Sequence, residues 1–326
     1  MRLAVLGAGA WGTALAIAFA GRHAVSLWSR AEDRPGEMAQ AGENRRFLPG
    51  FPFPASLRVE PDFSAALATA DLAILAAPLA GFRGLLEQLR ESAPKLPFLW
   101  VCKGLEAGSG LLPHQVVAEV MGEATCGVLT GPSFAIEVAR GLPTAVTLAA
   151  SDAAFARQMA QGLHGGNLRI YANEDLIGAE VGGAVKNVLA IATGICDGLG
   201  LGLNARAALI TRGLVEITRF GLALGANRET FMGLAGMGDL ILTCTGDLSR
   251  NRRVGLLLAQ GKSLPEISAE LGHVAEGVPA AREVARRAAE LGIEMPITRA
   301  VTAVLDGRIT PRAAVDQLMA RDPKHE

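Results

Sequence analysis

The sequence contains few aromatic residues, few cysteines and no excess of either charge. Aromatic residues make up 5% of its 326 residues, with a single tyrosine, and 31 basic residues face 32 acidic ones. Because the net charge is close to zero, there is no basic field that would attract nucleic acid or an anionic membrane. We therefore expect no nucleic-acid partner, and the balance favours a small-molecule substrate.

The cysteines and histidines form no pattern of metal ligands. The four cysteines, Cys102, Cys126, Cys196 and Cys244, lie far apart without a CxxC pair, so neither a zinc site nor a disulfide framework is indicated. The five histidines fall on unrelated segments and lack metal-ligand spacing. We predict no metal site, no catalytic histidine or cysteine, and reduced thiols in a cytoplasmic protein.

Long uninterrupted apolar runs are also missing. Residues 3–21 carry no charge and end in small residues, as a signal peptide does, but glycines at positions 7, 9 and 12 break the run. A buried strand, a turn and a helix explain this segment better. The most apolar later stretch contains Lys186 and Asp197, so we expect no membrane insertion.

The order of apolar patterns predicts two domains, which is also what the chain length favours. Short apolar runs typical of buried strands alternate with helical patterns in the first half; they cover residues 3–6, 24–28, 72–75, 98–101, 127–129 and 144–147. This alternation indicates an α/β domain with an open, mostly parallel, doubly wound sheet of the Rossmann type.

Helical patterns dominate after Asn173, with long stretches over residues 175–194 and 206–224. We therefore predict a dinucleotide-binding domain over residues 1–178. An all-α domain that binds substrate and carries the catalytic residue follows over residues 179–326.

The strongest local motif is the glycine-rich segment that follows the first predicted strand. Gly7, Gly9 and Gly12 form a GxGxxG pattern that also contains Trp11 and opens a helix. In such a loop the first glycine permits a tight turn, the second lets the backbone approach a pyrophosphate, and the third permits close helix packing. We predict that these four residues bind a dinucleotide, the alternative being a structural turn.

The residues after the second predicted strand leave the cofactor open between NAD and NADP. NAD-selective proteins usually place an acidic residue there, which bonds the ribose 2′-hydroxyl. This chain has Arg30, whose guanidinium can pair with a 2′-phosphate, although an arginine at a strand end is often only solvated. Glu32 is near enough to keep both choices open.

A single lysine, Lys186, lies within the apolar helical stretch of the second domain. Gly182 and Gly183 precede it by four and three residues, share its helix face, and are expected to leave space beside its ammonium group. A partly desolvated lysine can donate a proton to the alkoxide that forms when a ketone is reduced. A lysine that extends from a packed helix to solvent is the alternative.

Several segments occur in an order typical of one enzyme family. They are GAGAWGTALA at the start, NRRFLPG, KGLEAGSG, LTGPSFAIEVARGLPTA, GAVKNVLAIATGICDGLGLGLN over residues 183–204, AGMGDLILTC, SRNRR and VAEGV. Together they resemble the NAD-dependent glycerol-3-phosphate dehydrogenases, especially the bacterial NAD(P) form, over nearly the whole chain. The resemblance implies reversible reduction of dihydroxyacetone phosphate to glycerol 3-phosphate, a supply route for glycerophospholipid synthesis, and a homodimer.

The resemblance also implies roles for residues that match the family's motifs. Lys186 matches the proton-transferring lysine, Asp239 a substrate-contacting aspartate, and Lys103 a second lysine that contacts substrate and cofactor. The other matches are Gly131 and Ser133 for substrate, Ser249, Arg250 and Asn251 for its phosphate, and Ala135, Arg250, Val274 and Glu276 for cofactor.

Several of these matches have a plainer structural alternative. Lys103 can face solvent, Asp239 can form a turn, and residues 250–253 can be a solvated charge run. Pro132 and Ser133 can simply begin a helix. Pro279 departs from the more polar residue usual in the family, which leaves the local geometry open.

Two other functions are compatible with parts of this pattern. A β-hydroxyacid or phosphogluconate-type dehydrogenase has similar domains and a catalytic lysine. A dinucleotide-sensing protein without turnover is a rival of another class, but it has no evident use for the lysine, the aspartate and the phosphate-binding residues together.

Overall fold

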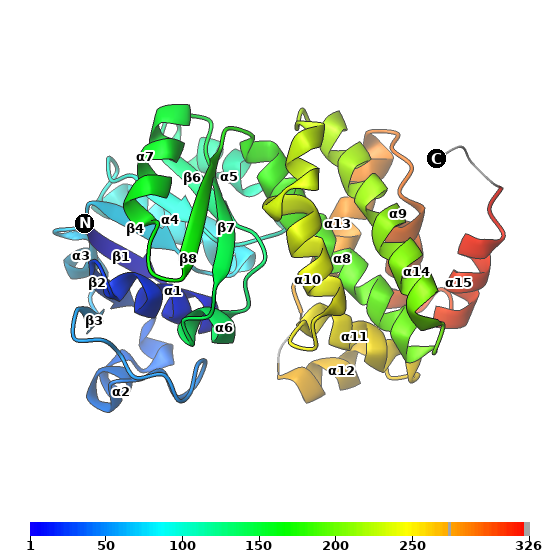
Figure 1. Ribbon diagram of the computed structural model, residues 1–326, viewed down its shortest axis with the longest axis horizontal. Helices are drawn as coiled ribbons and strands as arrows, with labels where there is room; N and C mark the ends of the chain where they lie inside the picture. The colour runs from blue at the N-terminus through cyan, green and yellow to red at the C-terminus, as the bar shows by residue number, and fades with distance from the viewer. Residues whose placement is uncertain (273–274, 323–326) are drawn as a thin grey trace. The chain divides into compact units, whose positions relative to one another are not determined.

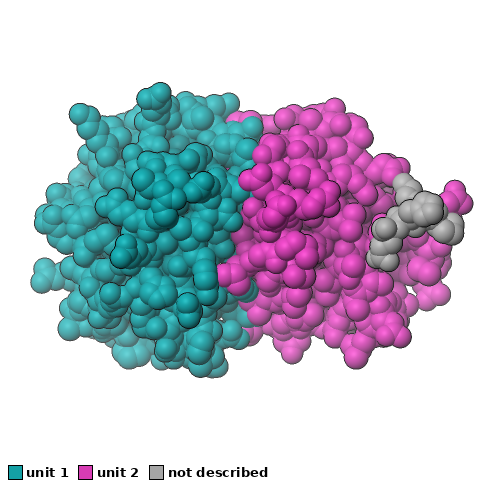
Figure 2. All heavy atoms as spheres, turned by 45° about the horizontal axis from the view of Figure 1, so that its top comes forward, with its two compact units in different colours: residues 1–103, 112–179 teal, residues 104–111, 180–326 magenta. Residues whose placement is uncertain are grey.

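The computed structural model describes residues 1–272 and 275–322. The chain divides into two compact units (Figure 2): unit 1 comprises residues 1–103 and 112–179, and unit 2 comprises residues 104–111 and 180–326. The predicted domain boundary at residue 178 lies one residue before the end of unit 1. The sequence did not indicate that residues 104–111 pack with unit 2, where the Gly108 amide donates to Glu283 at 3.0 Å. The functions assigned to the two domains stay predictions.

Unit 1 is built on an eight-stranded sheet with the order β3-β2-β1-β4-β5-β6-β7-β8 (Figure 1). The strands are β1 (Arg2–Leu6), β2 (Ala24–Trp28), β3 (Leu57–Glu60), β4 (Leu72–Leu75), β5 (Phe98–Trp100), β6 (Cys126–Thr130), β7 (Thr144–Ala149) and β8 (Leu168–Asn173). Strands β1 to β6 run parallel, β7 pairs antiparallel with β6, and β8 runs parallel with β7. The predicted open, mostly parallel sheet is confirmed.

Two strands, β3 and β8, were not predicted. They lie at the two edges of the sheet, and each mixes buried with exposed positions instead of forming a continuous apolar run. Arg58 and Glu60 interrupt β3, and Arg169 interrupts β8. Because an edge strand has only one neighbour and more solvent contact, its sequence need not be apolar throughout, and the search for buried strands missed it.

Helices lie on both faces of the sheet (Figure 1). They are α1 (Ala10–Ala20), the short helix η1 (Ala31–Asp33), α2 (Pro35–Ala41), α3 (Phe63–Leu67), α4 (Leu79–Ser92), α5 (Pro113–Met121), α6 (Ala135–Ala139) and α7 (Ala153–Leu163). Leu15 and Phe19 of α1 and Phe155 of α7 join the buried strand residues in one apolar cluster. This burial holds the loop after β1 in place at the end of the sheet.

Unit 2 is helical, as predicted. After α8 (Leu176–Gly198), which begins in unit 1, come α9 (Gly202–Ala223), the helical turns η2 (Arg228–Met232) and η3 (Leu234–Gly238), α10 (Asp239–Thr245), α11 (Arg250–Ala259), α12 (Leu264–Leu271), α13 (Gly277–Glu290), α14 (Pro296–Leu305) and α15 (Pro311–Met319). Helix α8 is long and apolar enough to cross a membrane, but 94% of its most apolar window is buried. A helix that is buried to this extent within the protein is a core helix.

Close backbone contacts made through glycines hold α8 against its neighbours. A Cβ atom on Gly194 would lie 2.0 Å from the Arg252 carbonyl oxygen, and one on Gly255 would lie 2.1 Å from the Ile191 carbonyl oxygen. No side chain fits at these positions, because real Cβ contacts are never so short. The two glycines therefore set how closely α8 and α11 approach.

Candidate active site

Lys186 lies in the buried middle of α8, with 7% of its surface exposed. Its Nζ group donates to the Asp239 carboxylate and, at 2.9 Å, to the Thr243 hydroxyl. Asp239 begins α10 and is 1% exposed, so it is not the solvent-facing turn residue that its sequence alone allowed. The structure thus joins two of the predicted residues in a buried ion pair, a geometry that fixes the position of the ammonium group.

Thr243 is a site residue that sequence reasoning missed. Its hydroxyl donates to the Asp239 backbone carbonyl at 2.6 Å, so its lone pairs are left to accept from Lys186. The available signal was the spacing: Thr243 follows Asp239 by four residues, which puts both on one face of a helix.

The space that we expected beside Lys186 is filled by protein at Gly182. A Cβ atom on Gly182 would lie 2.2 Å from the Ala235 carbonyl oxygen. The glycine therefore serves close packing of η3 against α8, and our expectation of open space there is wrong. Because Asp239 follows η3 directly, this contact brings its carboxylate to Lys186, one helical turn beyond Gly182.

The predicted phosphate-binding residues lie at the N-terminus of α11. The Ser249 hydroxyl accepts from the Arg252 amide at 3.2 Å and so caps the helix. Arg250 is exposed, whereas Asn251 accepts from the Gly277 amide through Oδ1 at 2.9 Å. Three groups that suit a dianion, a hydroxyl, a guanidinium and an amide, thus stand where the helix dipole also favours negative charge.

Residues 250–253 are not a uniform solvated charge run. Arg252 is mostly buried and bonds Asp197 of α8 at 2.7 Å, and Arg206 of α9 adds a bond to the same carboxylate at 3.1 Å. This ion-pair network ties the first turn of α11 to α8 and α9. Arg253 pairs with Glu270 at 3.2 Å. The four residues therefore differ in exposure and in their bonding partners.

The start of α13 meets α8 and α11 next to Lys186 in the chain. A Cβ atom on Gly277 would lie 2.8 Å from the Asn187 carbonyl oxygen and 2.7 Å from Asn251 Oδ1. Glu276 immediately precedes this contact as the N-cap residue of α13. Pro279 lies in the first turn of α13, where backbone amides have no carbonyl partner within the helix, so the lack of an amide proton costs no hydrogen bond. Val274, a predicted cofactor contact, lies outside the described residues.

In unit 1, the loop after β1 has the features that a dinucleotide pyrophosphate needs. Gly7 adopts φ +120°, and a Cβ atom on Gly12 would lie 2.0 Å from the Gly7 carbonyl oxygen. Gly9 is the N-cap of α1, and a Cβ there would meet nothing within 4 Å. The loop therefore offers an open backbone and a helix N-terminus to an anion, and Trp11 is partly buried beside it.

Asn44, from the segment NRRFLPG, is a second residue that sequence reasoning passed over. Its buried amide donates to the Ala8 carbonyl at 2.7 Å and to the Thr13 hydroxyl at 2.8 Å, while its oxygen accepts from the Phe47 amide at 3.1 Å. These bonds fix the glycine-rich loop from the side.

Four further predicted residues of unit 1, Lys103, Gly131, Ser133 and Ala135, lie after β5 and β6. Lys103 Nζ donates to the Gly131 carbonyl at 3.4 Å, and the Ser133 hydroxyl donates to the same carbonyl at 3.1 Å. Ala135 is the first residue of α6, and its N-cap is Phe134. Ser133 and Pro132 therefore do not begin the helix as suggested, because the hydroxyl bonds back to Gly131.

Arg30 is held by acidic neighbours at the end of β2. Its guanidinium lies 2.7 Å from Glu32 and 3.6 Å from Asp33, and its side chain is 66% exposed. Where this fold places the ribose 2′ position, the arginine thus already has a carboxylate partner that would compete with a 2′-phosphate.

Replacing Glu32 with glutamine is expected to shift dinucleotide preference towards NADPH. Removing the competing charge should raise the ratio of NADPH to NADH affinity about two- to fivefold, since an exposed pair contributes under about 1 kcal/mol. The two dissociation constants, measured by fluorescence titration, test this. Glu37→Gln, which removes the partner of Arg34, is the control, and an equal change for both dinucleotides would contradict the prediction.

Burial sets the protonation state of two cysteine thiols in unit 2, Cys196 and Cys244. It raises the pKa of the Cys244 thiol to about 12 and also raises the pKa of Cys196. Both thiols therefore stay protonated near neutral pH, as expected of structural residues rather than nucleophiles.

Known proteins resemble this chain over nearly its whole length. Family models described as the N-terminus and the C-terminus of NAD-dependent glycerol-3-phosphate dehydrogenase match residues 2–156 and 175–316. The NAD(P)+ glycerol-3-phosphate dehydrogenase of Dechloromonas aromatica is 68% identical over 327 residues, covering 100% of this chain and 99% of the relative. That of Aromatoleum aromaticum is 62% identical over 328 residues, covering 100% of both.

A crystal structure of glycerol-3-phosphate dehydrogenase from Coxiella burnetii superposes with a TM-score of 0.94 at 43% identity, covering 98% of this chain and 99% of that one. Both domains are thus shared with these relatives. The chain belongs to the NAD-dependent glycerol-3-phosphate dehydrogenase family.

Proposed function

We propose that Lys186 transfers the proton in the NAD(P)-dependent glycerol-3-phosphate dehydrogenase reaction of this family. The observation that carries the proposal is the buried Lys186 ammonium group, held by Asp239 and Thr243. Reduction of a ketone leaves an alkoxide oxygen, and a positioned ammonium donates a proton to it and accepts the proton in reverse. Asp239 and Thr243 keep Nζ in one place through both directions.

The substrate phosphate is proposed to dock at the N-terminus of α11. Arg250 supplies a forked guanidinium, Ser249 a hydroxyl and Asn251 an amide. The Asp197–Arg252 ion pair and the Gly194–Gly255 contact hold the start of α11 against α8. Gly131, Ser133 and Lys103 are proposed as further substrate contacts from unit 1.

Residues 7–12 fit a dinucleotide pyrophosphate, because Gly9 leaves the backbone open at the N-terminus of α1. When bound, the nicotinamide cofactor supplies or accepts the hydride. Trp11, Arg30, Lys103 and Ala135 in unit 1, and Arg250 and Glu276 in unit 2, are proposed as its other contacts.

Replacing Arg250 with alanine should mainly weaken substrate binding. Loss of a charged hydrogen bond to phosphate is expected to raise the KM for dihydroxyacetone phosphate roughly 10- to 100-fold. Steady-state kinetics measure this, and a small fall in kcat is compatible with it. Arg253→Ala, on the same helix but paired with Glu270, is the control; an unchanged KM in Arg250→Ala would count against the phosphate role.

The activity itself is tested by following reduced-nicotinamide absorbance after adding dihydroxyacetone phosphate, with NADH and NADPH side by side. We expect oxidation of at least one dinucleotide. The ratio of the two oxidation rates, with NADH and with NADPH, reports the cofactor preference. Turnover with another hydroxyacid only would favour the β-hydroxyacid rival. Dinucleotide binding without any substrate-dependent oxidation would favour a sensor.

The family relationship also suggests a proposal for the cellular setting. We propose a cytoplasmic homodimer in which unit 1 binds the dinucleotide and unit 2 carries the proton-transferring lysine. Its product would supply glycerophospholipid synthesis. Light scattering of the purified protein tests the oligomeric state.

A further inference from the structure

Unit 2 contains a pocket that shares no lining residue with the candidate active site. Its volume is about 520 Å³, within the range of small-molecule sites. The walls come from α8, α9, α14 and α15, and most of the lining is apolar, including Ile195, Leu209, Val301 and Leu318. A cavity of this size and composition suits an apolar chain rather than a polar metabolite.

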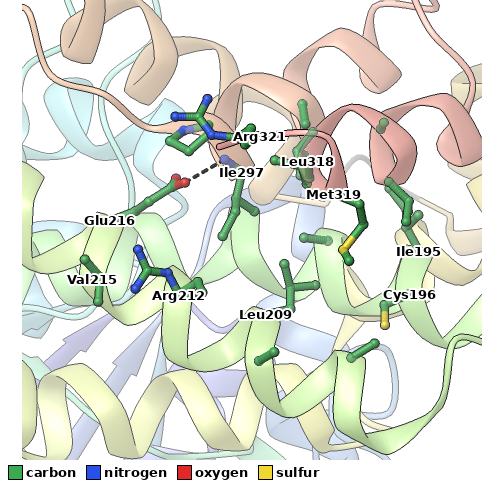
Figure 3. A pocket seen from close by; sticks show the side chains of 18 of the residues that line it. Ile195, Cys196, Leu209, Arg212, Val215, Glu216, Ile297, Leu318, Met319 and Arg321 are labelled. Carbon is green, nitrogen blue, oxygen red and sulfur yellow. Dashed lines mark hydrogen bonds between the residues drawn. The ribbon is translucent and has the colours of Figure 1, made fainter. Parts of the chain in front are cut away.

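The charged groups of this pocket gather at one end. Figure 3 shows Arg212, Glu216 and Arg321 on one side, with Leu318, Met319 and Cys196 towards the other. The pocket is therefore amphipathic along its length, with a polar end and an apolar end.

Two of the acidic residues that line the pocket, Glu216 and Glu294, bond to other groups of the protein. The buried Glu216 carboxylate accepts from the Ile297 amide at 2.6 Å and from the Thr298 amide and hydroxyl at 3.1 and 3.0 Å. It thereby caps α14, and these hydrogen bonds offset part of the burial effect that raises the pKa of Glu216. Glu294 pairs with Arg321 at 3.7 Å, and the third acidic lining residue, Asp322, is exposed.

Arg212 differs from these residues, because within the described chain it makes no hydrogen bond and no ion pair. It is exposed on α9, one turn before Glu216, the residue that caps α14. A guanidinium beside an apolar trough is complementary to a carboxylate or phosphate joined to a hydrocarbon chain, since it binds either group through two parallel bonds.

We propose that this pocket binds a single-chain anionic amphiphile, with its acidic head on Arg212 and its acyl chain along the apolar walls. Such a site goes beyond the dehydrogenase reaction, because it takes a ligand that is neither substrate nor cofactor. Binding there involves side chains of four helices, so the ligand joins α14 and α15 to α8 and α9.

Isothermal titration calorimetry of the full chain with four twelve-carbon probes tests the head and the chain separately. Dodecanoate and dodecyl phosphate should each bind saturably at one site per chain, below the concentrations at which they aggregate. Dodecanol and dodecyltrimethylammonium should bind at least tenfold more weakly, because they lack the anion that Arg212 recognises. Comparing the two anions shows which head group is preferred.

Variants locate the binding. Arg212→Gln should weaken dodecanoate binding about tenfold or more, and Ala208→Phe should block the pocket from an exposed position of α9. Arg299→Gln, an exposed arginine of α14 outside the pocket, is the matched control. Neither pocket variant touches the proposed dehydrogenase residues, so the result is independent of turnover.

Three outcomes would overturn the proposal. They are the absence of saturable binding, equal binding of the cationic and anionic probes, and binding unchanged in both pocket variants. Light scattering adds a fourth: if dodecanoate binds only when a dimer dissociates, the pocket is a surface between two copies and not a ligand site.

Discussion

Replacement of Lys186 with methionine is expected to lower kcat by about 10²- to 10⁴-fold, the usual contribution of a general acid. Methionine has a similar length but no proton to donate, and it cannot stabilise the alkoxide. The glycine-rich loop lies in unit 1, so dinucleotide affinity should stay near the wild-type value. Single-turnover kinetics and fluorescence titration with NADH measure the two quantities.

The same substitution should also destabilise unit 2. It leaves Asp239, which is 1% exposed, as a buried carboxylate without its ammonium partner, and breaking such a pair costs about 3–5 kcal/mol. Lys186→Met/Asp239→Asn removes both charges and should recover part of the melting temperature without recovering activity. Near-normal turnover of the single variant would refute the assignment of Lys186.

Replacement of Gly255 with alanine should damage stability and substrate binding together. The new Cβ would lie 2.1 Å from the Ile191 carbonyl oxygen and 2.8 Å from the Gly194 Cα atom. Because both contacts are backbone, α11 must move away from α8, at a cost of about 1–3 kcal/mol. That shift would displace Ser249 to Asn251, so the KM for dihydroxyacetone phosphate should rise as the melting temperature falls.

Gly84→Ala is the matched control for this experiment. Gly84 also lies within a helix, α4, but an added Cβ would meet nothing within 4 Å. Alanine favours a helix over glycine by roughly 1 kcal/mol, so this variant should be neutral or slightly more stable. A Gly255→Ala protein with unchanged stability and KM would show that α8 and α11 tolerate separation.

Features that depend on local periodicity could be predicted well. The buried strands around Leu3 and Leu72 are continuous apolar runs, and the helix containing Lys186 has an extended apolar pattern. The glycine-rich loop could also be predicted, because the steric need for glycine at each of its positions is local. Such patterns are local because residue spacing along a strand or helix decides which side chains share a face.

Features that depend on a partner elsewhere in the chain could not be predicted in the same way. The role of Gly182 is an example: its spacing led us to expect open space beside Lys186, whereas the Ala235 backbone occupies that space. Ser133 is another, since its position suggested a helix start while its hydroxyl bonds Gly131.

The chain's own pattern therefore indicated the α/β and all-α halves, the glycine-rich loop after β1 and the candidate lysine, because each depends on short-range sterics and burial. Folding decided that Lys186 meets Asp239, 53 residues away, and that Thr243 completes their contact. It also decided that Arg252 anchors α11 while Arg250 stays exposed. These outcomes depend on how closely helices pack, which backbone contacts at a few glycines determine and no local pattern encodes.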